Sequence, residues 1–78
     1  MWEVAQDKLL EAKILKQKVL EKLETEDTLS DDMKRTLSLA HSYLEDAITF
    51  FDMKEYNDAF LSAQQAVAYY QEILTLLT

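Results

Sequence analysis

Residues 55–77 of the chain read EYNDAFLSAQQAVAYYQEILTLL, and apolar side chains recur in this segment at every third or fourth position. With about 100° of rotation per residue, these positions share one side of an α-helix. The small residues Ala59, Ala63 and Ala66 lie together on that side, where a methyl group leaves little between two packed backbones. The segment therefore predicts a helix that another helix approaches closely.

Two further segments show the same amphipathic pattern. In residues 2–24 the apolar side chains form one stripe, and most charged side chains fall away from it. Lys16 interrupts this stripe, so we expect its aliphatic stem to lie along the edge of the core with its ammonium group in water. Residues 31–51 form a broader stripe, which favours contact with two neighbours. Ser30 precedes them as a predicted N-cap, with two acidic residues in the first turn where the helix dipole favours them.

The composition of the chain supports an all-helical fold. Its 78 residues include no Gly, no Pro and no Cys. Tight hairpin turns favour Gly or Asn, whereas a helix can end on other residues, so the composition disfavours a β-sheet. We predict a single all-α domain over residues 1–78, an up-down-up three-helix bundle with helices at about 2–24, 31–51 and 55–77. Disulfides, cysteine zinc sites and glycine-rich phosphate loops are excluded.

The charge of the chain is acidic and unevenly distributed. Fifteen acidic and eight basic residues give a formal net charge of −7. Residues 1–24 hold five acids and five bases, whereas residues 25–78 hold ten acids and three bases. Binding to a phosphate backbone needs a basic face, so we predict no nucleic-acid partner.

The sequence shows no pattern typical of a membrane protein. No apolar run approaches the roughly 18–20 residues of a membrane span. The first residues also lack the basic and apolar regions of a signal peptide. We therefore expect no membrane partner and a cytoplasmic location, with which the lack of Cys agrees.

Residues 43–66 carry aromatic and small side chains at a regular spacing. The pattern consists of Tyr43, Ala47, Phe50, Tyr56, Ala59, Ala63 and Ala66. It resembles one tetratricopeptide-type helical hairpin, in which an aromatic and a small residue of the first helix meet an alanine ladder on the second. An array of such repeats needs about three copies, so the resemblance implies a way of packing two helices.

A second resemblance covers the whole chain. A charged leading segment is followed by LSDD at 29–32, YLEDA at 43–47, Tyr56, and Ala59-Phe60. These motifs are similar to those of the small archaeal domain-of-unknown-function family 357, whose members form three helices of about this length. Lys54-Glu55 stands where that family has Gly-Asp before the Tyr. The resemblance implies the three-helix fold and carries over no activity.

A third resemblance would imply chemistry. The string AQQAV at 63–67 resembles the end of a hairpin in helical RNase and nucleotide-binding domains of the toxin–antitoxin type. Their active site is an Arg followed by a His after four to six residues, and Arg35 and His41 satisfy that spacing. The family places this pair after the hairpin, whereas here it precedes the hairpin. An RNase or nucleotide-binding fragment that uses Arg35 and His41 is therefore the alternative hypothesis.

Other polar residues have a structural and a chemical interpretation. His41 and Glu45 lie one helical turn apart, where they can share a metal or a proton, or lie on the rim of the bundle. Asp27, Asp31 and Asp32 can bind a divalent cation loosely or cap a helix. Two ligands without a third or fourth do not make a metal site. We predict no catalytic residue, no metal and no cofactor.

Several apolar residues remain outside the predicted core. They include the candidate interface residues Leu10, Ile14, Leu61, Tyr69 and Leu76. A contiguous exposed apolar patch calls for a partner, whereas scattered residues do not. The favoured hypothesis is a small non-enzymatic helical protein that acts by protein–protein contact, through homodimerisation or a partner-binding groove.

Overall fold

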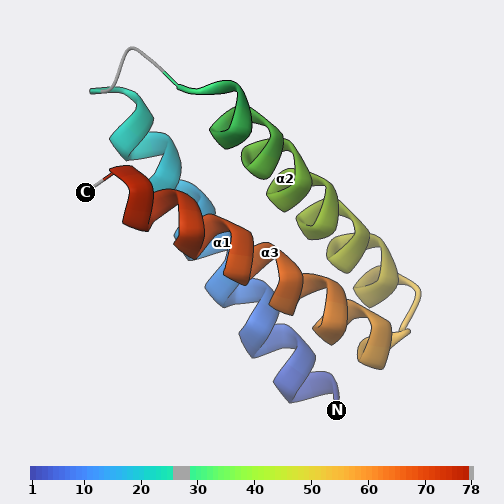
Figure 1. Ribbon diagram of the computed structural model, residues 1–78. Coiled ribbons are helices and arrows are strands. Elements are labelled where there is room, and N and C mark those ends of the chain that lie inside the picture. Colours follow the sequence, from blue (N-terminus) through green and yellow to red (C-terminus); the bar gives the residue numbers. More distant parts are fainter. Residues whose placement is uncertain (26–28, 78) are drawn as a thin grey trace.

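The fold is a bundle of three helices that run up, down and up (Figure 1). The computed structural model describes residues 1–25 and 29–77. Helix α1 spans Trp2–Leu23, α2 spans Asp31–Asp52 and α3 spans Tyr56–Leu77. The predicted all-α three-helix architecture is confirmed, and each predicted helix end lies within one residue of the observed end. The candidate residue Asp27 lies outside the described residues.

Helix α3 occupies the central position in the bundle. It packs closely against both α1 and α2, whereas α1 and α2 make few contacts with each other. The fully buried Ala59, Ala63 and Ala66 allow this close approach, because their methyl groups keep the neighbouring backbones near. Ala40 and Ala47 supply a matching small surface on α2. The alanine ladder thus makes α3 the helix that holds the other two.

The turn between α2 and α3 is a Schellman motif that is built without Gly. The N–H of Glu55 donates to the carbonyl of Phe50 at 2.8 Å, and the N–H of Lys54 donates to that of Phe51 at 3.0 Å. This pattern needs a left-handed residue after the helix, which is usually Gly. Lys54 fills the position with φ of 63°. A side chain with a Cβ is strained there, so the turn is held by its two hydrogen bonds.

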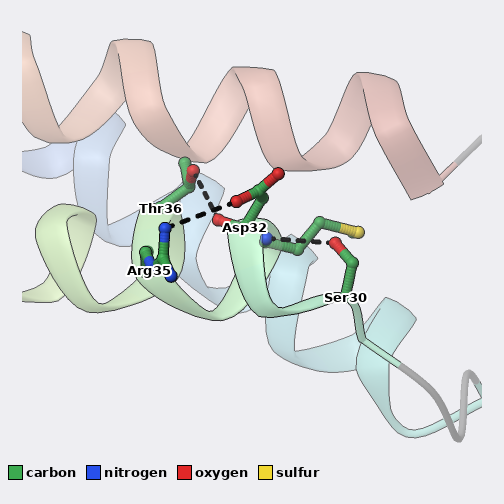
Figure 2. A network of polar contacts seen from close by, with 5 residues as sticks. Ser30, Asp32, Arg35 and Thr36 are labelled. Carbon is green, nitrogen blue, oxygen red and sulfur yellow. Dashed lines mark hydrogen bonds and ion pairs between the residues drawn. The ribbon is translucent and has the colours of Figure 1, made fainter.

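The start of α2 has the predicted cap, which Figure 2 shows from close by. The side chain of Ser30 accepts a hydrogen bond from the backbone N–H of Met33 at 3.2 Å. Asp32 lies in the first turn, where its carbonyl accepts from the Thr36 hydroxyl at 3.0 Å. Arg35 reaches the carboxylate of Asp32 at 3.6 Å, with both side chains largely in water. All three contacts are local to the helix start, and the Ser30 cap is the one that stabilises it, since an ion pair in water contributes little.

No helix in the described parts of the chain is both long and apolar enough to cross a membrane. The bundle is a rod, 38 Å long and 18 by 15 Å across.

Candidate functional site

A groove runs between α1 and α2, because these two helices flank α3 without packing closely on each other. Its volume is about 560 Å³. The lining residues are Gln6, Asp7, Leu9, Leu10 and Lys13 from α1, and Ile48, Phe51 and Asp52 from α2. We call this feature the α1–α2 groove. Four of its side chains are apolar, and the charged ones are two carboxylates and one ammonium group.

An aromatic cluster adjoins the α1–α2 groove near the start of α1. The ring of Trp2 lies 6.3 Å from that of Phe51, which in turn meets Tyr56 edge-on at 5.3 Å. Trp2 belongs to the apolar stripe of the sequence, yet 46% of it is exposed. Trp2 is the first residue of α1 and precedes Ala5, the first buried residue of this helix. The cluster therefore adds exposed aromatic surface beside the groove.

The predicted interface residues are located on two different helices. Leu10 and Ile14 of α1 are 55% and 49% exposed, one helical turn apart. Leu61 and Leu76 of α3 are also exposed, but fifteen residues, or about 22 Å of helix, separate them. Tyr69 is half-buried and stacks on Tyr43 with ring centroids 5.7 Å apart. The structure thus brings Leu10 and Ile14 together, and Leu10 alone of the five lines the α1–α2 groove.

A polar contact joins α2 and α3 inside the bundle. Tyr70 is fully buried, and its hydroxyl lies 2.5 Å from Nδ1 of His41. Burial raises the pKa of Tyr70 to about 12, and the negative charge of Glu45 acts in the same direction. The neutral hydroxyl can therefore donate its proton to the imidazole, which then carries its own proton on Nε2.

Charges from two helices act on the imidazole of His41. Burial lowers its pKa, and the positive charge of Lys16 on α1 lowers it further, whereas Glu45 on α2 opposes both. His41 is therefore neutral at pH 7 and accepts the hydrogen bond from Tyr70. Lys16 is partly buried, as the sequence predicts for a stem laid along the core edge. The hydrogen bond between His41 and Tyr70 thus links α2 to α3, and Lys16 of α1 acts on it through its charge.

The residues of the alternative hypothesis point to different sides of α2. Arg35 and His41 are six residues apart, which corresponds to about 240° of rotation and 9 Å of rise. The side chain of Arg35 is 78% exposed and pairs with Asp32. His41 instead faces the bundle and is engaged with Tyr70. The structure does not bring the two side chains together on one face.

The other polar candidates have structural neighbours. Asp31 and Asp32 lie in the first turn of α2, as expected for residues at a helix start. Glu45 is exposed one turn from His41, whose Nδ1 is occupied by Tyr70. Within residues 1–25 and 29–77, no three carboxylate or imidazole side chains come together as a metal site would need.

The sequence analysis missed two features of the site. The contact between His41 and Tyr70 could have been predicted, since a Tyr on the buried stripe of one helix needs a hydrogen-bond partner from another helix. The α1–α2 groove has no signal in the sequence, because a pattern of apolar residues does not show which pair of helices is in closest contact. Comparisons with family models, with curated proteins and with solved structures gave no match to this chain.

Proposed function

We propose that this chain is a non-catalytic protein–protein interaction module whose binding surface is the α1–α2 groove and the adjoining exposed side of α1. The observation that carries the proposal is the apolar lining of the groove, in which Leu10 is exposed, Ile48 and Phe51 are half-buried and Leu9 is buried beneath them. Such a lining gains free energy when a partner covers it. Trp2 enlarges the apolar surface at one end.

A helix is the partner segment that best fits the shape of this surface. The groove is lined by about two turns of α1, residues 6–13, and by about one turn of α2, residues 48–52. A further helix laid along it would complete a four-helix arrangement, with side chains from one edge inserted between those of α1 and α2. Amphipathic helices commonly bind in grooves of this kind through apolar residues spaced three and four apart.

Two expectations from the sequence form part of the same proposal. The similarity to the archaeal domain-of-unknown-function family 357 would make this chain one of a set of small three-helix proteins. A cytoplasmic location would suit a chain that has no Cys. Neither expectation adds a catalytic role.

Site-specific photo-cross-linking tests the proposal. A photoreactive phenylalanine analogue replaces Leu10 at the groove, or Leu61 as a control of similar exposure on α3. Irradiation of cells that express each variant should give a covalent adduct to a polypeptide from position 10 and little from position 61. Mass spectrometry of the adduct identifies the polypeptide, whether a second copy or another protein. Absence of adducts from position 10, or equal adducts from both positions, would overturn the proposed surface.

A further inference from the structure

We infer that the partner is a second copy of this chain, and that the two copies pair through their α1 helices in antiparallel orientation. The inference rests on the proposed function and adds the identity and direction of the partner helix. Three observations support it: the position of two exposed apolar residues, the distribution of charge along α1, and the charge of the rest of the chain.

Two of the exposed apolar residues of α1, Leu10 and Ile14, lie at its middle. Leu10 and Ile14 are on the side of the helix away from the buried Ala5 and Ala12. The helix runs from residue 2 to residue 23, and Leu10 and Ile14 lie two residues on either side of position 12. A two-fold axis near position 12 would set Leu10 of one copy against Ile14 of the other, and the reverse. An interface with this symmetry uses the same patch twice.

The charges of α1 have a direction along the helix. Its first half holds three acids, Glu3, Asp7 and Glu11, and one base, Lys8, which pairs with Glu11 at 2.9 Å. The second half holds one acid, Glu21, and four bases. These are Lys13, Lys16, Lys18 and Lys22. Lys16 lies along the core edge, so the charges on the same side of α1 as Leu10 and Ile14 are those of Glu3, Asp7, Lys18 and Glu21. Antiparallel pairing about position 12 places Asp7 near Lys18 of the other copy and Glu3 opposite Glu21. Parallel pairing places every one of these charges beside its like, so the antiparallel orientation is the less repulsive one.

The rest of the chain disfavours self-association through other faces. All of the net charge of −7 lies in residues 25–78, which hold ten acids and three bases. Two copies that met through α2 or α3 would bring these negative surfaces together, with repulsion that salt screens only in part. Residues 1–24 hold five acids and five bases, so two copies that meet through α1 avoid most of this electrostatic repulsion. Leu10 also lines the α1–α2 groove, so a second α1 on this side covers the mouth of the groove.

Sedimentation equilibrium at micromolar to millimolar concentrations tests whether copies pair through α1. The wild-type chain should form a dimer that dissociates on dilution. Leu10→Glu should weaken the dimer by about tenfold or more, because symmetry places the substitution in the interface twice. Leu61→Glu adds the same charge at an exposed position of α3 and should leave the dimer unchanged. Circular dichroism verifies that both variants stay helical.

Engineered disulfides test the orientation, and the absence of native Cys makes them specific. Positions 7 and 17 lie ten residues apart on α1, so in an antiparallel pair each faces the other across the two-fold axis. A mixture of Asp7→Cys and Gln17→Cys should therefore form the mixed disulfide in preference to either symmetric one, whose positions are about 15 Å apart along the helix. Parallel pairing would give the symmetric disulfides instead.

The outcomes separate this inference from the proposed function. A wild-type chain that stays monomeric, with an adduct from position 10 to a different protein, overturns the inference and keeps the groove as a binding surface. A monomer without any adduct overturns both. A dimer that Leu61→Glu weakens and Leu10→Glu does not overturns the α1 interface. Should Leu10→Glu lose its helical signal, the disulfide mixture decides the question.

Discussion

Replacement of His41 by Leu should destabilise the protein through the hydroxyl of Tyr70. That hydroxyl is fully buried and is hydrogen-bonded to His41 at 2.5 Å. In the described residues every buried side-chain nitrogen and oxygen has a hydrogen-bond partner. His41→Leu would leave the hydroxyl of Tyr70 buried without one. An unpaired buried hydroxyl costs about 1–3 kcal/mol. In a domain of this size each kcal/mol lowers the melting temperature by about 4–8 °C.

The matched variant Tyr70→Phe removes the hydroxyl itself. Nδ1 of His41 then loses its donor, but His41 is only partly buried and water can reach it. We therefore expect a smaller loss, near 0.5–1.5 kcal/mol, and a double variant that is more stable than His41→Leu alone. Urea unfolding followed by circular dichroism gives the four free energies of the cycle. The expected coupling between the two positions is about 1 kcal/mol.

The same contact predicts a dependence of stability on pH. Burial and Lys16 hold the pKa of folded His41 below the ordinary value of 6.5, so the unfolded chain takes up the proton more readily. The contribution of His41 is complete above pH 6.5 and is lost as the pH falls through the folded pKa. The advantage of wild type over His41→Leu should therefore shrink between pH 8 and pH 5. A constant difference across this range, together with a double variant no more stable than His41→Leu, would refute the reasoning.

Three further predictions concern the helix ends and the core, each measured as the free energy of urea unfolding. Lys54→Gly should stabilise the protein by about 0.5–1 kcal/mol, because Gly removes the strain of the left-handed φ of 63°, whereas Lys54→Ala should change little. Ser30→Ala should cost about 1 kcal/mol through loss of the cap, and Ser38→Ala on the exposed side of α2 serves as the control; equal effects would contradict the role of the cap. Ala63→Leu should cost about 1–3 kcal/mol because it forces α3 away from its neighbours, while the exposed Ala68→Leu should stay within about 0.5 kcal/mol; a tolerated Ala63→Leu would contradict the close helix approach.

Local patterns of the sequence predicted the elements of the fold well. Ser30 and the acidic residues after it fixed the start of α2 within one residue, since capping depends on neighbours in the sequence. The spacing of Ala59, Ala63 and Ala66 predicted the closely packed side of α3 for a similar reason, because helical rotation alone brings them together.

Features that depend on how helices are placed relative to each other could not be predicted in this way. Tyr69 falls beside the apolar stripe of its own helix, a position that indicates a candidate interface residue, yet Tyr43 of α2 stacks on it. Trp2 lies on the stripe of α1 but precedes Ala5, the first buried residue of this helix. The left-handed turn residue also gave no signal, since Lys is not typical of that position. Each of these depends on the relative rotation, offset or connection of two helices.

The central place of α3 has a consequence for how the molecule can deform. Helices α1 and α2 each pack on α3 and share few contacts with each other, so either helix can change its tilt while the other keeps its position. An increase in the distance between α1 and α2 therefore disturbs the packing of one of them on α3 and leaves the packing of the other intact. The free-energy cost of binding a bulkier segment between α1 and α2 therefore falls mainly on the contacts of one outer helix with α3. Helix α1 makes the smaller set of contacts with α3, so its packing sets how far α1 and α2 can separate.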